Sequence, residues 1–398
     1  MAVVVRLCNF RCDTLPADRL HRAAMRLLIL TSTLIGALVH AQPCPPRPSW
    51  PTASWPVKLV SATDKKAAID DLEAFAFTLT GKDGERLGIR TDSLVIIKNG
   101  TIVYERYARG FDADKPHLSW SVAKSLSSAL IGVAVHRGAL ALTDSICRFV
   151  PEAEGTKHCS ITVKDLITFS SGMKWQEEYE NQTYQVSSVL SMLFGVGHKD
   201  QLKHILSHPV SGTPGTTWMY STGDAQLASL VARRALEPND GKDAFWTQLF
   251  DRIGLSKLVF EEDGKGMPQG GSAIYATPRD FAKFGFLFLN DGCWNGERLL
   301  PEGWVKASTT PSDAYVATLP AEPRPSGYSW WLNRPLPAQS RPKPWPDVPE
   351  DAYAASGHWG QRIVVVPSED VVIVRFGDDR KGAIDANGLI KRALEVTR

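Results

Sequence analysis

Two segments rich in β-branched residues, one near each end of the chain, constrain the fold more than any other feature. Residues 94–104 hold two strand-like runs joined by Asn99-Gly100, the strongest short-range signal for a tight hairpin. Residues 362–366 and 371–376 form a second pair around a Pro-Ser-Glu-Asp turn. Strands at both ends with other structure between them predict one antiparallel sheet to which both ends contribute.

The chain between the hairpins is mainly helical in pattern, which predicts the α+β class. Apolar periodicity predicts helices at 64–80, 122–137, 162–168, 199–206, 223–235, 244–253, 278–290 and 384–396. The predicted architecture is an α/β sandwich, with a central antiparallel sheet flanked by helices and an all-helical insert at about 141–264. Residues 61–398 would form this domain.

Two proline-rich stretches lie outside the predicted helices and strands. Residues 42–60 are expected to be a stiff, extended linker rather than part of a core. Residues 320–349 contain Trp330, Trp331 and Trp345, and we interpret them as a surface loop over a cleft. The alternative for this second stretch is a poorly ordered insertion.

Residues 25–41 have the pattern of a secretory signal peptide. Met25-Arg26 precedes an apolar run at 27–39, and Ala41 offers a small residue for cleavage. The run is shorter than the about 20 residues that cross a bilayer, so no stable membrane span is expected in the mature protein. We expect a periplasmic or secreted protein. The alternative is that residues 27–39 form a buried core helix. Residues 1–24 fit no signal pattern, so translation could begin at Met25.

The charge balance and the cysteine spacing bear on possible binding partners, zinc sites and disulfides. The 45 basic and 43 acidic side chains form no like-charged block, so neither nucleic acid nor a membrane surface is indicated. Cys8 and Cys12 would leave with the leader, and the other four cysteines lack zinc-ligand spacing. Cys147 and Cys159 could close a short disulfide loop in an oxidising compartment, or remain two unpaired core residues.

One Ser-x-x-Lys sequence stands at the start of a predicted helix. Ser121 precedes an apolar-periodic stretch, so N–H groups of the helix terminus lie near its hydroxyl. Lys124 returns to the same helix face, where burial would lower the pKa of its amine and make it the base that a serine nucleophile needs. The same spacing at 171–174 and 340–343 is interrupted by a turn-like Ser-Gly and by a proline. The alternative for 121–124 is an N-cap serine beside a solvated lysine.

Two further segments carry reactive or conformationally special residues. Residues 218–224 place Tyr220 at a loop–helix junction, where Asp224 fixes the tyrosine or caps the helix, and we favour the cap. Residues 354–361 run directly into a predicted strand. Gly357 and Gly360 would let a substrate approach the strand backbone closely.

These three elements, in this order, resemble the serine β-lactamase and penicillin-binding protein superfamily. The likeness is greatest to its class C, esterase and 6-aminohexanoate-dimer hydrolase branch. It covers most of residues 60–395, including 165–173 in the insert. It implies a β-lactamase/transpeptidase-like fold, with Ser121 as acylated nucleophile and Lys124 and Tyr220 sharing the role of general base. Backbone N–H groups of Ser121 and His358 would form the oxyanion hole.

Two positions depart from the family pattern. Thr222 stands where class C β-lactamases have asparagine, and Ala355 replaces the lysine expected to bind a substrate carboxylate. The resemblance therefore favours an ester or amide substrate over penicillins and peptidoglycan peptides.

The resemblance also suggests candidate substrate contacts, namely Ser356, Gly357, Trp359 and Glu178. His358, beside Trp359, is either a substrate contact or a packing residue. Residues 177–179 either receive a substrate amine or form a solvated acidic loop, and we favour the loop.

Several other enzyme classes lack their motifs here. No Gly-x-Ser-x-Gly, His-Glu-x-x-His or nucleotide-binding glycine sequence occurs, so we expect no metal and no cofactor. The sequence predicts an exported serine hydrolase that cleaves a small-molecule ester or amide through an acyl-enzyme on Ser121. Two alternatives stay open: a D,D-carboxypeptidase or weak class C-like β-lactamase, and a non-catalytic penicillin-binding or sensor-like module on the same fold.

Overall fold

The computed structural model describes residues 44–85, 87–180, 182–380 and 384–398. The predicted signal peptide, the start at Met25, the cleavage near Ala41, and Cys8 and Cys12 lie outside these residues. Within them, no helix combines the length and the apolar character needed to cross a membrane.

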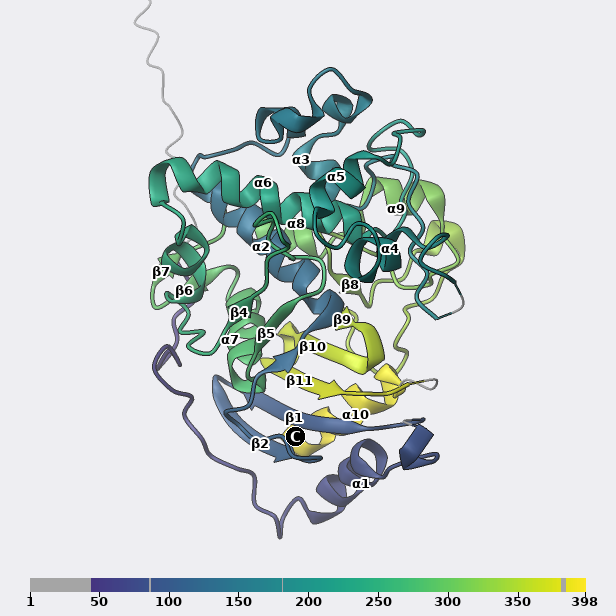
Figure 1. The fold of residues 1–398 in the computed structure, drawn as a ribbon. Helices are drawn as coiled ribbons and strands as arrows, with labels where there is room; N and C mark the ends of the chain where they lie inside the picture. Colours follow the sequence, from purple (N-terminus) through teal and green to yellow (C-terminus); the bar gives the residue numbers. More distant parts are fainter. Residues whose placement is uncertain (1–43, 86, 181, 381–383) are drawn as a thin grey trace, which may run out of the picture. The chain divides into compact units, whose positions relative to one another are not determined.

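Strands from the two ends of the chain form one six-stranded antiparallel sheet (Figure 1). Its order is β2 (Thr101–Tyr107), β1 (Thr91–Lys98), β11 (Val371–Gly377), β10 (Gln361–Val366), β9 (Tyr353–Gly357) and β8 (Trp331–Leu332). The two hairpins meet where β1 pairs with β11, from Lys98 opposite Val371 to Thr91 opposite Gly377. The predicted α+β class, with a sheet built from both ends, is confirmed.

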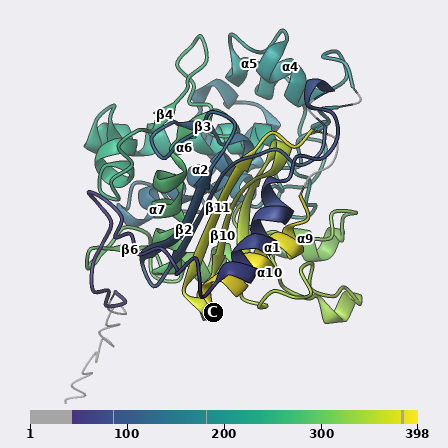
Figure 2. The ribbon, with the colours of Figure 1, turned by 90° about the horizontal axis from the view of Figure 1, so that it is seen from below.

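Alternating apolar residues of the central strands lie in two different cores, one on each face of the sheet. A third, smaller cluster includes Phe169, Trp218 and Trp331. Val95 and Ile97 of β1 lie in the larger core, together with α2 (Ala123–His136) and α7 (Pro278–Leu289). Leu94 and Ile96 lie in the other core, with α1 (Lys66–Phe77) and α10 (Ala386–Thr397). Helices α1 and α10 pack on each other beside the sheet (Figure 2). Because successive side chains point to opposite faces, a continuous apolar run buries both faces of the sheet.

The other helices among the described residues are α3 (Val163–Ile167), α4 (Ser188–Phe194), α5 (Gln201–Leu206), α6 (Thr222–Asp240), α8 (Trp304–Ser308) and α9 (Asp313–Thr318), with a π-helical turn at Trp246–Phe250. The short strands are β3 (His117–Leu118), β4 (Val259–Phe260), β5 (Ile274–Ala276), β6 (Cys293–Trp294) and β7 (Glu297–Arg298). Helix α6 packs along α2. The predicted insert at about 141–264 is not all helical, because it contains strand β4, which pairs with β5 beyond residue 264.

The described part of the proline-rich stretch at 42–60 is not a free linker. Trp55 is buried in the larger core, and its Nε1 donates to the carbonyl oxygen of Arg279 at 2.8 Å. Val57 forms a parallel bridge with Ile102 of β2. Prolines do hold this segment extended, but its tryptophans supply apolar area that is stable only when packed.

The tryptophans of 320–349 are likewise buried, so the prediction of a surface loop is wrong for them. Trp330 is fully buried against Phe288, with ring centroids 4.5 Å apart. Trp331 belongs to β8 at the edge of the sheet, and Trp345 lies in the core that contains α1 and α10. The apolar area of these large aromatic side chains favours a packed position for this segment, although it is rich in proline.

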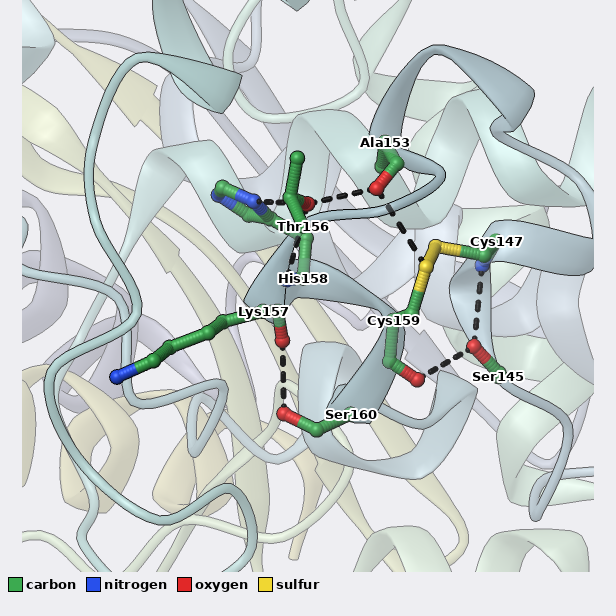
Figure 3. The surroundings of a disulfide bond; sticks show 8 residues. All are labelled: Ser145, Cys147, Ala153, Thr156, Lys157, His158, Cys159 and Ser160. Carbon is green, nitrogen blue, oxygen red and sulfur yellow. Dashed lines mark hydrogen bonds between the residues drawn. A yellow bond between two sulfur atoms is a disulfide. The ribbon is translucent and has the colours of Figure 1, made fainter.

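Two disulfides are present among the described residues. Cys147 pairs with Cys159, 12 residues away, and the loop between them is held by further hydrogen bonds, such as that from Ser145 Oγ to the carbonyl oxygen of Cys159 (Figure 3). Cys44 pairs with Cys293 across a sequence separation of 249, a bond that the cysteine spacing gave no reason to expect. The second disulfide anchors the segment before Trp55 to the body of the protein.

Candidate active site

Ser121 lies in a short helical turn, Trp120–Val122, that leads directly into α2. Trp120 has a φ of +47°, a left-handed conformation that costs a non-glycine residue about 1 kcal/mol or more. Its ring makes edge contacts with His358 and Trp359 at centroid distances of 5.5 and 5.2 Å. The packing of these rings therefore stabilises the backbone that presents Ser121.

Lys124 points from the first turn of α2 toward Ser121. Its Nζ donates to Ser121 Oγ at 2.8 Å and to the carbonyl oxygen of Gly271 at 2.8 Å. The side chain is 1% exposed, and burial lowers the pKa of the amine to about 8, although the nearby Glu177 carboxylate acts in the opposite direction. A neutral Lys124 would accept the proton of the Ser121 hydroxyl.

Tyr220 completes the group around Ser121 from the loop before α6. Its ring stacks on Trp331 at 5.5 Å and contacts Phe169 at 5.0 Å, and Lys124 Nζ lies 4.9 Å from the ring centroid. Burial raises the pKa of the phenol well above its usual range, while a hydrogen bond with Ser121 partly opposes this shift. The phenol therefore stays protonated at neutral pH, which suits it to pass a proton on rather than to remove the first one.

Glu177 forms a second polar layer behind these groups. It accepts from the Thr222 backbone N–H at 2.8 Å, from the Thr222 hydroxyl, and from Trp175 Nε1 at 2.6 Å. Its charge raises the pKa values of Lys124 and Tyr220. The solvated acidic loop predicted at 177–179 does not describe Glu177, whose position is set by its contact with Thr222, 45 residues away.

A pocket of about 470 Å³ opens beside Tyr220. Its lining includes Trp218, Glu322, Arg324, Trp331 and Arg362, together with the predicted contacts Ser356, Gly357 and Trp359 and the neighbouring His358. The lining does not include Glu178, which instead accepts a hydrogen bond from Ser187 Oγ at its backbone carbonyl, at 2.6 Å. The cation pair of Arg324 and Arg362 was not singled out from the sequence.

Gly357 brings β9 close to the turn that contains Ser121. A Cβ atom at this position would lie 2.4 Å from the carbonyl oxygen of Ser119, so only glycine allows the two backbones to approach in this way. His358 follows at the end of the strand. Its ring stacks on Tyr179 at 5.0 Å, and its Nε2 lies 2.9 Å from Glu180 Oε1. The imidazole is thus packed and paired, while its backbone stays beside the pocket.

Asp224 does not cap α6. Ser221 is the N-cap residue and accepts from the backbone N–H of Asp224 at 3.0 Å. Asp224 lies in the first helical turn, where its carboxylate accepts from Ser171 Oγ at 2.8 Å and from Ser221 Oγ at 3.1 Å. Burial raises the pKa of Asp224 to about 7. The cap was assigned to the wrong residue because serine and aspartate are about equally good N-cap residues.

The chain belongs to the beta-lactamase family, whose model matches residues 68–397. The resemblance to the serine β-lactamase superfamily is thereby confirmed, and this family consists of serine hydrolases.

Two kinds of relative accompany this match. The 6-aminohexanoate-dimer hydrolase of Paenarthrobacter ureafaciens is 24% identical over 223 residues, which span 54% of this chain and 56% of that protein. A solved structure of a 6-aminohexanoate-dimer hydrolase homologue from Bacillus anthracis has a TM-score of 0.66 at 20% identity, with 87% of each chain covered. A class C β-lactamase structure has a TM-score of 0.58 at 14% identity, covering 85% of this chain and 98% of that one. The predicted β-lactamase/transpeptidase-like fold is confirmed.

Proposed function

We propose that this protein is an exported serine hydrolase that cleaves an ester or amide through a covalent acyl-enzyme on Ser121. The observation that carries the proposal is the 2.8 Å contact between Ser121 Oγ and Lys124 Nζ. Burial lowers the pKa of this amine to about 8. Near neutral pH such an amine is unprotonated in a useful fraction of molecules, so it can remove the hydroxyl proton as the nucleophile attacks.

The reaction has two balanced halves. First, Ser121 Oγ bonds to the substrate carbonyl carbon and its proton passes to Lys124 Nζ; the bond from that carbon to the leaving oxygen or nitrogen then breaks, and the leaving group takes the proton through Tyr220. Second, a water oxygen attacks the acyl carbon and loses a proton to the same groups, and Ser121 Oγ leaves and is reprotonated. Backbone N–H groups of Ser121 and His358 would stabilise each oxyanion, at about 3 kcal/mol per donor.

The residues at 222 and 355 support an ester or amide rather than a β-lactam. The Thr222 hydroxyl donates to Glu177, so it is already engaged within the protein. Ala355 is fully buried and offers no charge where the β-lactam-directed relatives have lysine. A D,D-carboxypeptidase or weak β-lactamase is the second candidate, favoured by the structural likeness to a class C β-lactamase. A silent binding or sensor module is the third possibility to be tested.

Export is proposed on two independent grounds. The signal-peptide pattern at 25–41 predicts cleavage near Ala41, and the described residues contain the disulfides Cys44–Cys293 and Cys147–Cys159. Disulfides persist in the periplasm and outside the cell and are rare in the cytosol. N-terminal sequencing of the protein recovered from a periplasmic or culture fraction should begin near Gln42. An intact N-terminus on protein that stays in the cytosol would contradict export.

The experiment that tests the catalytic proposal is active-site labelling of the purified mature protein. A fluorophosphonate probe should modify Ser121, as mapped by mass spectrometry of the tryptic peptide. Labelling by the phosphonate without labelling by a fluorescent penicillin would support the ester or amide assignment, and labelling by both would support the second candidate.

Ser121→Ala should abolish labelling, whereas Ser340→Ala, which alters another Ser-x-x-Lys sequence, should leave labelling unchanged. Circular dichroism would show that both variants are folded. An absence of any adduct at Ser121 in folded wild-type protein would overturn the enzyme proposal and favour the silent module.

A further inference from the structure

A buried glutamine on α6 lies behind the lysine of the candidate active site. Gln226 is fully buried, and its Oε1 accepts a hydrogen bond from the backbone N–H of Gly271 at 2.5 Å. Gly271 is also the residue whose carbonyl oxygen accepts from Lys124 Nζ at 2.8 Å. Gln226 is therefore linked to Lys124 through a single residue of the main chain.

A chain of side-chain amides fixes the orientation of Gln226. Its Nε2 donates to Oε1 of Gln201, the first residue of α5, and Gln201 Nε2 donates to Gln269 Oε1 at 3.1 Å. The backbone N–H of Gln201 donates in turn to Asp263 Oδ2 at 2.7 Å. Because Nε2 of Gln226 faces an oxygen of Gln201, its own oxygen is turned toward Gly271. Buried polar groups are stable only when hydrogen-bonded, so each amide of this chain holds the next in one orientation.

The peptide group before Gly271 is held from two helices. Its carbonyl oxygen, that of Gly270, accepts from Ser127 Oγ of α2 at 2.8 Å, while its N–H donates to Gln226 of α6. A Cβ atom at Gly271 would lie 2.6 Å from Thr222 Cγ2, so only glycine allows the chain to pass here. Since glycine has a wide range of backbone angles, the direction of its carbonyl oxygen depends on these hydrogen bonds.

The direction of that carbonyl oxygen decides how the amine of Lys124 is turned. Among the described residues, Nζ has two hydrogen-bond partners, Ser121 Oγ and the carbonyl oxygen of Gly271, each at 2.8 Å. A neutral amine has two N–H bonds and one lone pair, and only the lone pair can take the serine proton. An N–H bond held by Gly271 turns the lone pair toward Ser121, whereas a free amine would also present its N–H bonds to the hydroxyl.

We propose that Gln226, oriented by Gln201, is a positioning residue for the general base Lys124. It fixes the backbone at Gly271, and the carbonyl oxygen of Gly271 then orients the amine. The inference rests on the proposed function and adds to it two buried amides that act on the base through the main chain. An apolar side chain at position 226 would fill the same space inside the protein but would leave the orientation of the amine unset.

The test is the pH dependence of fluorophosphonate labelling in Gln226→Met, which keeps the length of the side chain and loses both hydrogen bonds. In the plateau above about pH 8, the second-order rate constant should fall about tenfold, which is the effect of one hydrogen bond. The midpoint should move down by about one pH unit, because the ammonium form of Lys124 loses an acceptor that stabilises its charge. Melting curves recorded before the kinetics ensure that only folded protein is compared.

The sign of the midpoint shift separates positioning from packing. If Gln226 only filled space, its loss would admit water to Lys124 and raise the pKa toward the ordinary value of a lysine. The titratable side chains near Lys124 are the same in both proteins and cannot cause a difference; they are Glu177, Tyr220 and His358.

Two further variants sharpen the test. Gln201→Met removes the support of Gln226 and should shift the midpoint in the same direction by a smaller amount, so it carries the test if Gln226→Met does not fold. The matched control is Ser229→Ala, because Ser229 is buried about one turn further along α6 and its Oγ donates to the carbonyl oxygen of Pro268 at 2.9 Å. The control should lower the melting temperature and keep both the rate constant and the midpoint.

Three results would overturn the inference alone. They are an unchanged plateau rate constant in Gln226→Met, a midpoint that stays or rises in this variant, or the same downward shift in Ser229→Ala, which would mean that the whole segment rather than the amide sets the base. The absence of Ser121 labelling in folded wild-type protein would instead overturn the proposed function, so the two failures are distinguishable.

Discussion

Buried cations in two regions of this molecule have opposite surroundings. In the scaffold, Lys283 of α7 lies 3.2 Å from Asp280, and Arg375 of β11 is held by two hydrogen bonds to Asp379. Around the candidate active site, Lys124 donates to a hydroxyl and a carbonyl oxygen, and Arg362 donates to a single hydroxyl. These two scaffold cations each contact a carboxylate, whereas Lys124 and Arg362 contact none among the described residues. Arg324 of the same pocket differs from them, because it is paired with Glu322.

This difference separates structural from chemical use of the same residue types. A buried cation with a carboxylate partner is stable only as an ion, and removing either member leaves an unpaired charge. A buried lysine without that partner has a lowered pKa and can exchange a proton, and a buried arginine without it can receive an external anion. The following predictions test this contrast, from the largest expected effect to the smallest.

Lys124→Ala should slow the fluorophosphonate labelling of Ser121 by about 10³-fold, because the variant lacks the base that removes the hydroxyl proton. The second-order labelling rate constant, measured on protein with a native far-UV spectrum, checks this. An unchanged rate constant would mean that another group removes the proton.

Lys283→Met should leave the rate constant for labelling of Ser121 unchanged. It should lower the free energy of unfolding by about 3 kcal/mol, because the buried carboxylate of Asp280 loses its cationic partner. Urea unfolding followed by tryptophan fluorescence provides the measurement. The double variant Lys283→Met/Asp280→Asn should recover part of the lost stability, since neither charge then remains. A single variant as stable as the wild type would show that the scaffold pair is not needed.

The labelling rate should rise about tenfold per pH unit below about pH 8 and level off above it, because only neutral Lys124 accepts the proton. Asp224, whose pKa burial raises to about 7, is another buried group near this range, so Asp224→Asn serves as the control and should keep the midpoint.

Stability should also depend on pH through Lys124. The unfolded chain keeps the proton to about pH 10.5, while the folded chain releases it near pH 8. Burial of the charged ammonium therefore destabilises the folded chain fully below about pH 8, and this destabilisation disappears between about pH 8 and pH 10.5. Lys124 thus makes the free energy of unfolding rise with pH in this interval. A slope of the opposite sign in this interval, absent in Lys124→Ala, would contradict the lowered pKa.

Arg362→Met should increase the free energy of unfolding by about 1 kcal/mol, because it removes a buried cation that has no counter-ion and keeps most of the side-chain volume. The same urea unfolding assay checks the change. A clear loss of stability would identify Arg362 as a scaffold residue, like Arg375.

The parts of the fold that follow from local signals could be predicted from the sequence. The Asn99-Gly100 turn and the β-branched runs gave both hairpins, and apolar periodicity placed the long helices within a few residues of their observed ends, apart from α6, which continues through Pro238 to Asp240. The contact between Ser121 and Lys124 also depends on local geometry, because a spacing of three residues sets them on one helix face.

Features that depend on distant pairing could not be predicted in this way. The orientation of Arg362 follows from the register between β9 and β10, and β9 was not predicted as a strand. The place of Glu177 depends on its hydrogen bonds with Thr222, and the burial of Trp55 depends on its packing against Phe286. For Glu177 and Trp55 the decisive neighbour lies far along the chain, and a single sequence carries no signal for it. For Arg362 the neighbour Ser356 is near in sequence, and the missing information is the register of the two strands.

The two disulfides have a consequence for how the protein matures. The bond Cys147–Cys159 is nested inside Cys44–Cys293, and a chain that enters an oxidising compartment N-terminus first presents Cys44 to Cys147 and Cys159 long before Cys293 arrives. Cys44 and Cys147, which are neighbours in the order of emergence, are therefore not native partners. Correct maturation requires either that the short loop closes first or that a mismatched bond at Cys44 is exchanged by thiol–disulfide chemistry. If an exported chain follows the second route, the yield of native protein would depend on a disulfide isomerase as well as on the stability of the fold.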